Sequence, residues 1–269
     1  MKKILLQALT LCLGWSAIAQ KLPKVQEAGL RAPANIKIDG KATEWDKFAA
    51  YNATTGTFYT LSNDGERVYL VVQVKDFEII NKILGGGLTL TVQKSTDKKD
   101  KDKITITYPI TDSKTALAFN VSAMKMNPNN PGTLMADTTA KAADSLMEVH
   151  NKILIQKCKL IGVRGIEGID TTISVYNEDG IKAAGLFDRK ATYTLEMSVP
   201  LKHLKLTVDT ADKFNYNIRI NGLKRTDELF GTFSGSAAAL ARITQQLDER
   251  NARQASATDF WGEYVLVKK

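Results

Sequence analysis

Residues 67–76, RVYLVVQVKD, decide the fold class. Side chains alternate along this stretch, so that one face of an extended strand is wholly apolar and the other is half apolar. Two apolar faces predict a central strand that is packed on both sides near its start. The preceding Asn63-Asp64-Gly65 is a hairpin-turn signal, so we expect this strand to pair with residues 56–64, which are rich in strand-forming residues.

Similar alternation continues along the chain. Further strands are predicted at 87–93, 103–110, 171–177, 181–188, 191–201, 214–223 and 261–267. Pro200 is expected to end its strand or to place it near an edge. Helical spacing is confined to 136–151 and 236–254. We therefore predict a mainly β protein: a single antiparallel β-sandwich, jelly-roll or immunoglobulin-like, over residues 20–269, with its core at 36–267 and one or two helical insertions.

Residues 1–19 have the pattern of a signal peptide. Lys2 and Lys3 precede a short apolar run, and Ala17 and Ala19 form a small-residue cleavage site. The apolar run is too short to span a bilayer comfortably, and no later run is long enough. We expect an exported chain, periplasmic, outer-surface or secreted, with no membrane span after cleavage.

Charge and cysteine content exclude some classes of function. The formal net charge is +8, but the lysines are scattered, and residues 94–103 mix both signs. This pattern is typical of a solvated hairpin tip, so we expect no nucleic-acid partner. Cys12 leaves with the signal peptide, and the remaining Cys158 is interpreted as a small core residue.

The opening segment, IKIDGKATEW at 36–45, contains the Asp39-Gly40 turn pair and Trp45. It predicts a short strand, a tight turn and an indole that closes one end of the sandwich together with Phe48.

This segment, together with YTLSNDGERVYLVVQVKD and the terminal TDFWGEYVLV, resembles family 9 carbohydrate-binding modules and their DOMON-like relatives. The stretches SVYNEDGIKAAGLFD and YTLEMSVPLKHL, with the TDFWGEY of the last strand, more closely resemble uncharacterised secreted proteins of the Bacteroidota. The resemblance implies a β-sandwich that clamps sugar between aromatic rings, often with structural calcium. It also implies that Asp39, Gly40 and Trp45 are structural motif residues.

Aromatic side chains on strands are the candidate carbohydrate-binding residues. We select Trp261, Tyr264 and Tyr59, and favour Trp261 because it lies at the start of the last strand, near a loop. No cofactor is expected, although the Asn63–Glu66 and Asn177–Gly180 turns carry oxygen ligands that suit Ca²⁺. No catalytic residues are assigned, because acidic residues are scattered and His150 and His203 have no nucleophile elbow to work with.

The sequence therefore predicts an exported, non-catalytic binding module with an oligo- or polysaccharide ligand. Two alternatives remain open. One is a structural or interaction component of the cell envelope, which would bind a protein partner through the narrow apolar stripe of 236–254. The other is a haem-binding, DOMON-like electron-transfer domain, with ligands among Met124, Met126, Met147 and His150.

Overall fold

The computed structural model describes residues 21–94, 103–111, 140–223, 245, 249 and 252–268. Four sequence predictions fall wholly or mostly outside this part of the chain. They are the signal peptide at 1–19, the hairpin tip at 94–103, the haem-ligand candidates Met124 and Met126, and most of the helix at 236–254.

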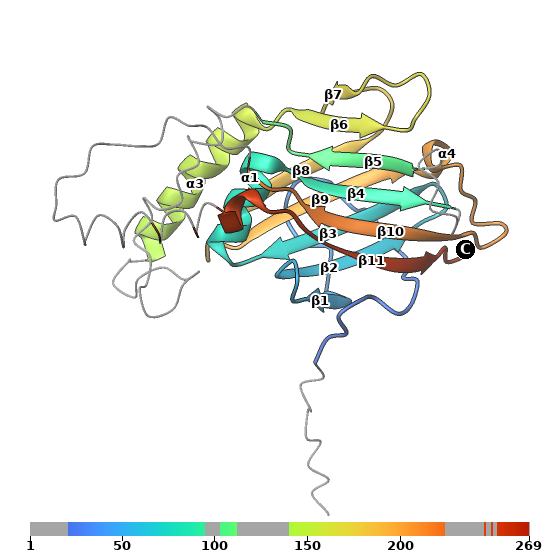
Figure 1. The fold of residues 1–269 in the computed structure, drawn as a ribbon, viewed down its shortest axis with the longest axis horizontal. Coiled ribbons are helices and arrows are strands. Elements are labelled where there is room, and N and C mark those ends of the chain that lie inside the picture. The colour runs from blue at the N-terminus through green and yellow to red at the C-terminus, as the bar shows by residue number, and fades with distance from the viewer. Residues whose placement is uncertain are drawn as a thin grey trace, which may run out of the picture.

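Two antiparallel sheets lie face to face, as predicted (Figure 1). The five-stranded sheet has the order β1-β2-β3-β9-β8, and the six-stranded sheet has the order β11-β10-β4-β5-β6-β7. The first contains β1 (Ala50–Asn52), β2 (Thr57–Asn63), β3 (Arg67–Val74), β9 (Tyr193–Pro200) and β8 (Lys182–Phe187). The second contains β11 (Thr258–Val265), β10 (Lys213–Ile220), β4 (Leu88–Gln93), β5 (Lys103–Tyr108), β6 (Leu160–Arg164) and β7 (Thr172–Ser174).

The core lies between the sheets and is formed by alternate residues of their strands. Strand β9 supplies one inward set and β10 supplies another, and both sets are buried as predicted: Tyr193, Leu195, Met197, Val199, and Phe214, Tyr216, Ile218, Ile220. Pro200 ends β9, which lies inside the sheet between β3 and β8 rather than at its edge. Successive side chains of a strand point to opposite faces of the sheet. The residues between these inward side chains therefore point to the outer faces of the two sheets.

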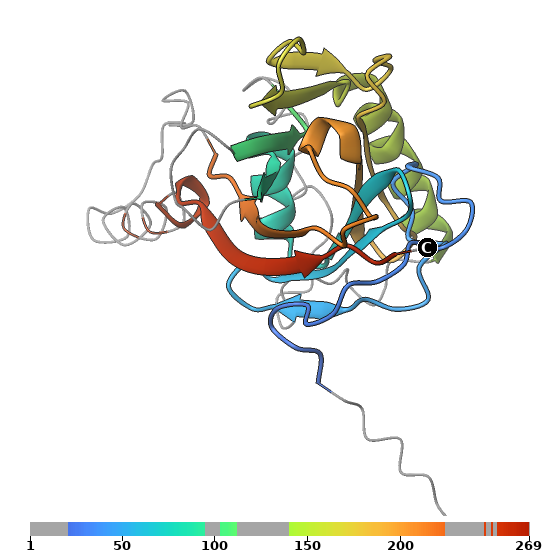
Figure 2. The same cartoon turned by 90° about the vertical axis from the view of Figure 1, so that its right-hand side faces the viewer.

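Strand β3 is central and is buried on both faces, which confirms its prediction. Its second face is covered because the N-terminal segment, residues 35–49, lies against the outer side of the five-stranded sheet. Figure 2 shows this blue segment on the side of that sheet away from the six-stranded sheet. The Ala49 amide donates to Thr60 Oγ1 of β2 at 2.9 Å, and Phe48 packs on Phe58 with ring centroids 6.1 Å apart.

Two predictions for this segment were wrong. Residues 36–38 form no strand. Trp45 does not close an end of the sandwich but lies half-buried on the outer face of the five-stranded sheet, where its indole contacts β9. Local alternation could not show this, because it does not reveal which sheet face an unpaired segment covers.

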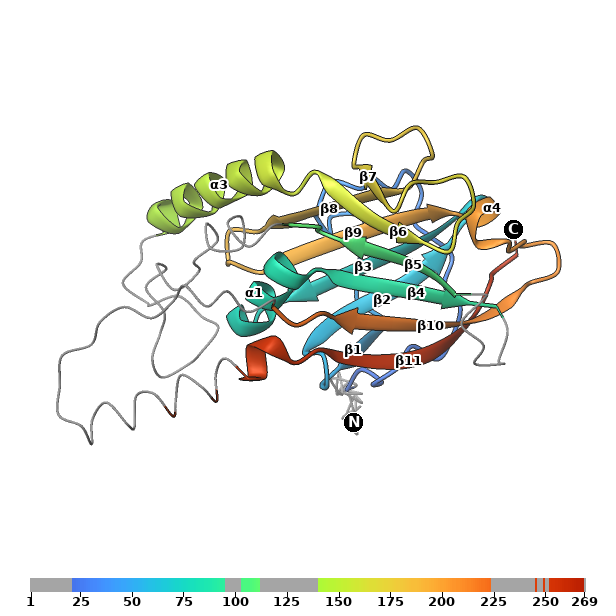
Figure 3. The same ribbon diagram turned by 45° about the horizontal axis from the view of Figure 1, so that its top comes forward.

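Helices α1, α3 and α4 accompany the sheets, and residues 252–255 are helical as well. Helix α1 (Phe77–Gly86) joins β3 of one sheet to β4 of the other, at the end of the sandwich seen in Figure 3. Helix α3 (Ala140–Lys157) packs beside β8 and continues beyond the predicted end at residue 151. The short α4 (Leu201–Leu204) follows β9. Within the described residues, we find no helix with the length and apolar character that a membrane crossing requires.

Candidate functional site

The outer face of the six-stranded sheet carries the candidate site. Strand register places five side chains directly opposite one another across five strands, from β11 at one edge to β6. They are Trp261, Asn217, Thr91, Thr105 and Arg164. We call this set the cross-strand row. At a strand spacing of about 4.8 Å, four steps make the row about 19 Å long.

Trp261 is the aromatic end of the row. Its neighbours Phe260 and Tyr264 are buried between the sheets, so alternation directs Trp261 outward, and 47% of the residue is exposed. Single exposed apolar side chains are common on proteins, and Tyr176 and Ile155 of this chain are more exposed than Trp261. Trp261 is the candidate because its ring lies on a paired strand, on an otherwise polar sheet face. It offers a flat apolar ring beside an N–H donor.

Amide and hydroxyl groups occupy the middle of the row. Asn217 Nδ2 donates to Asp259 Oδ2 at 2.7 Å and to the Phe260 carbonyl at 2.8 Å, which fixes the amide beside the indole. Thr91 and Thr105 follow on β4 and β5. Asn217 and Thr91 are buried at 5% and 8% exposure, so the accessible side chains of the row are Trp261, Thr105 and Arg164. In the adjacent row, the hydroxyls of Thr89 and Thr107 lie 2.8 Å apart. The face is therefore polar, with hydrogen-bonding groups at regular strand spacing.

The other two aromatic candidates are not on this face. Tyr59 and Tyr264 are buried in the core, so their rings are not available to a ligand, and the sequence-based choice of these two residues is corrected here. The Tyr59 hydroxyl lies 2.9 Å from that of Tyr216 and accepts from the Gln26 amide at 2.8 Å. Burial raises the pKa of both Tyr59 and Tyr264, as expected for core phenols.

The structural motif residues meet at one buried carboxylate. Glu196 of β9 is 0% exposed. Its Oε2 accepts from the backbone amides of Asp39 and Gly40 at 3.0 and 2.9 Å, and its Oε1 accepts from Trp45 Nε1 at 3.1 Å. Burial raises the pKa of Glu196 to about 7, while the hydrogen bonds from Trp45, Asp39 and Gly40 lower it.

Gly40 has a positive φ of 80° at this contact, and a side chain there would meet the backbone of Gly185 and Leu186. The turn pair thus needs glycine for two reasons: the left-handed conformation and the close approach to β8. The motif that carries the family resemblance therefore fastens the N-terminal segment to the sheet.

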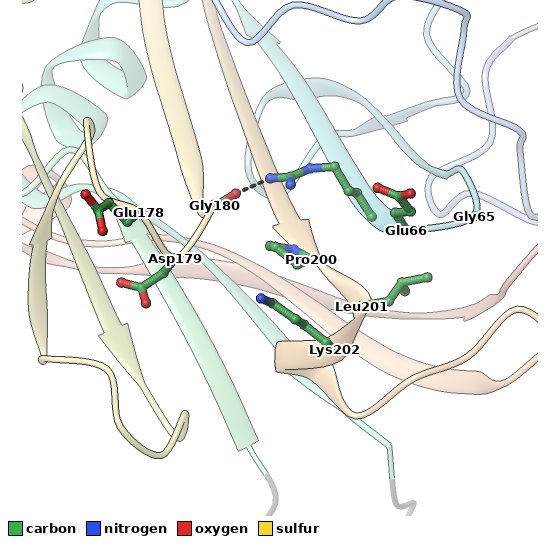
Figure 4. Close-up of a pocket in the computed structure, with 9 residues that line it drawn as sticks. Gly65, Glu66, Glu178, Asp179, Gly180, Pro200, Leu201 and Lys202 are labelled. Atoms are coloured by element: carbon green, nitrogen blue, oxygen red, sulfur yellow. Dashed lines mark hydrogen bonds between the residues drawn. The ribbon is translucent and has the colours of Figure 1, made fainter.

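The two acidic turns come together in a pocket of about 480 Å³ at the end of the sandwich. Arg67 joins them, since its guanidinium donates to the Gly180 carbonyl (Figure 4). The same guanidinium also donates to Ser198 Oγ of β9. Glu66 and Glu178 lie at opposite ends of the pocket, and Lys202 extends from α4 toward Asp179. The pocket thus mixes both charge signs.

Two of the side chains that suggested calcium, Asp64 and Asn177, form hydrogen bonds at or near their own turns. Asp64 Oδ1 accepts from the amides of Glu66 and Arg67, and Oδ2 accepts from the Tyr69 hydroxyl at 2.6 Å. Asn177 Nδ2 donates to the carbonyls of Ser174 and Ile181. In the described part of the chain, no three His, Cys, Asp or Glu side chains are grouped so that they could hold a metal ion.

The remaining titratable and sulfur-bearing candidates are packed against apolar neighbours. Met147 and His150 of α3 are buried, and the His150 ring packs edge-on to Phe187 of β8. Burial lowers the pKa of His150 and raises that of the Cys158 thiol to about 12. A thiol with such a pKa is a poor nucleophile, consistent with the interpretation of Cys158 as a core residue.

Comparison with models of protein families and with curated proteins gives no match to this chain. The fold and the geometry of the outer face are therefore the basis for the function proposed below.

Proposed function

We propose that this protein is an exported, non-catalytic module that binds carbohydrate on the outer face of the six-stranded sheet. The observation that carries the proposal is the half-exposed indole of Trp261 in register with the fixed amide of Asn217. A sugar has apolar ring faces and a polar rim, so it matches a flat, exposed indole on a polar sheet face.

The position of Trp261 within a sheet supports the same proposal. A side chain on a paired strand is held more precisely than one on a loop, and less ordering of the protein is then needed on binding. Strand β11 pairs with β10 along all eight of its residues, from Thr258 to Val265. The face is thus set before ligand arrives, and we expect little backbone change between free and bound protein.

Calorimetric titration with a panel of neutral and acidic oligosaccharides tests this proposal. We expect Trp261→Ala to weaken binding at least about tenfold, since stacking on one aromatic ring is worth on the order of 1–2 kcal/mol. Tyr176→Ala is the matched control, because Tyr176 is an aromatic residue that is 73% exposed and lies outside the cross-strand row. Silence across the whole panel, or equal affinity of Trp261→Ala and the parent chain, contradicts the proposal.

A further inference from the structure

The cross-strand row ends in a positively charged side chain, that of Arg164. Arg164 is exposed on β6, and no hydrogen bond or ion pair joins it to any described carboxylate. Strand register places it opposite Thr105, at the far end of the row from Trp261. Other exposed cations of the face do have partners: Lys213 lies 2.6 Å from Glu263, and Arg219 lies 3.9 Å from Asp259.

The charge on this face is therefore asymmetric along the row. Asp259 and Glu263 are both on β11, beside Trp261, whereas Arg164 stands at the β6 end. A guanidinium is planar and presents paired N–H donors that match a carboxylate. A ligand that stacks an uncharged ring face on Trp261 and places carboxylates toward β6 satisfies both ends.

We propose that the ligand is an acidic glycan, an extended chain that crosses the strands from Trp261 to Arg164 and carries a uronic acid residue at the Arg164 end. This inference rests on the proposed carbohydrate-binding function and adds the chemical class of the sugar. The row, about 19 Å long, spans several linked sugar rings, so one chain contacts both ends at once. The carboxylate bound by Arg164 then selects uronates over neutral sugars.

Titration of the full chain with hexagalacturonate, with cellohexaose as the neutral probe of equal length, tests the inference. A chelator is included so that Ca²⁺ does not cross-link the uronate. We expect hexagalacturonate to bind more tightly, and Arg164→Gln to weaken its binding about tenfold, as the loss of a charge-assisted pair does.

Lys182→Gln is the matched control, because it removes one positive charge from the outer face of the opposite sheet. If only the overall charge matters, both variants will bind hexagalacturonate equally more weakly than the parent chain. That result overturns the role of Arg164. Raising the salt concentration should weaken hexagalacturonate binding more for the parent chain than for Arg164→Gln, since salt screens interactions between exposed charges.

The remaining outcomes separate the two proposals. If both hexasaccharides bind equally, and this binding is lost in Trp261→Ala but kept in Arg164→Gln, the carbohydrate-binding function stands. The preference for uronate is then overturned. Failure of both hexasaccharides and of the oligosaccharide panel overturns both proposals. Tighter binding of a single-stranded thymidine oligonucleotide than of hexagalacturonate also overturns the inference, because the face then serves nucleic acid.

Discussion

Glu196 shows how a single side chain determines where the N-terminal segment lies. Burying a carboxylate is costly unless hydrogen bonds compensate for the lost hydration. Here two backbone amides and one indole N–H point at its two oxygens. Because these donors come from the Asp39-Gly40 turn and from Trp45, the segment cannot leave the sheet without exposing or orphaning the carboxylate.

Trp45→Phe tests this role while keeping an aromatic ring in place. The substitution removes the only donor to Glu196 Oε1 among the described residues, and we expect a loss of about 1–3 kcal/mol in the free energy of unfolding. Urea denaturation measures it. Trp261→Phe is the control, since this exposed indole has no hydrogen-bond partner in the described chain, and its effect should stay within about 0.5 kcal/mol. Equal losses in the two variants contradict the role of the Trp45 indole.

The raised pKa of Glu196 also predicts how stability depends on pH. Its pKa is about 7 in the folded protein and 4.5 in the absence of burial, so between these values the folded state binds more protons than the unfolded state. The free energy of unfolding therefore falls as pH rises from about 4.5 to 7, by up to about 3 kcal/mol from this group.

Denaturation midpoints measured across this range for the parent chain and for Glu196→Gln check the sign. The glutamine cannot titrate, so the descending slope should be smaller in the variant. If the stability of the parent chain instead rises between pH 4.5 and 7, and Glu196→Gln shows the same slope, then Glu196 is not the titrating group.

At the scale of elements, strands were predictable because burial alternates along them. The inward sets of β3, β9 and β10 all follow from this period of two. Helix α1 was missed although its signals are present: Asp76 is a capping residue, and Phe77, Ile80 and Leu84 have helical spacing. The helix begins three residues after the end of β3, and Asp76 was interpreted as the end of that strand's segment.

The partners of each element could not be predicted locally. Glu196 sits at an outward position of β9, which predicts a solvated side chain, yet residues more than 150 positions earlier cover it. The same holds for the candidate site. The sequence indicated Trp261, but its alignment with Thr91, Thr105 and Arg164 depends on the strand order β11-β10-β4-β5-β6, which no local pattern specifies.

Asp76 offers a test of α1 as an independent element. Its Oδ1 accepts from the amides of Glu78 at 2.8 Å and Ile79 at 3.3 Å. Asp76→Ala leaves these amides without a cap and should lower the free energy of unfolding by about 1 kcal/mol. Asp76→Asn keeps an oxygen acceptor, so thermal denaturation should place it close to the parent chain. If both variants lose the same stability, the effect comes from the charge and not from the cap.

At the scale of the whole molecule, Asn63 joins parts of the chain that are far apart in sequence. The sequence identified it as a turn residue, but it ends β2 and is fully buried. Its backbone forms hydrogen bonds with Leu30 and Ala32, which precede the N-terminal segment, at 3.0 and 2.8 Å. Its side-chain Nδ2 donates a hydrogen bond to the Val267 carbonyl. Its Oδ1 accepts hydrogen bonds from the Val267 amide and, at 3.0 Å, from the Tyr264 hydroxyl. Asn63 thus links the five-stranded sheet to the segments at both ends of the described fold.

Asn63→Ala should therefore be among the most destabilising polar substitutions in the protein. It removes every side-chain bond to Val267 and leaves buried partner groups unsatisfied, so we expect a loss of about 3 kcal/mol, or about 6–12 °C in Tm. Calorimetry measures the shift. Asn215→Ala, on the outer face of the six-stranded sheet, is the control and should change Tm by no more than about 2 °C. Near Val267, this substitution removes only the side-chain hydrogen bonds of Asn63. If the Tm of Asn63→Ala falls only slightly, apolar contacts alone hold these segments to the sandwich.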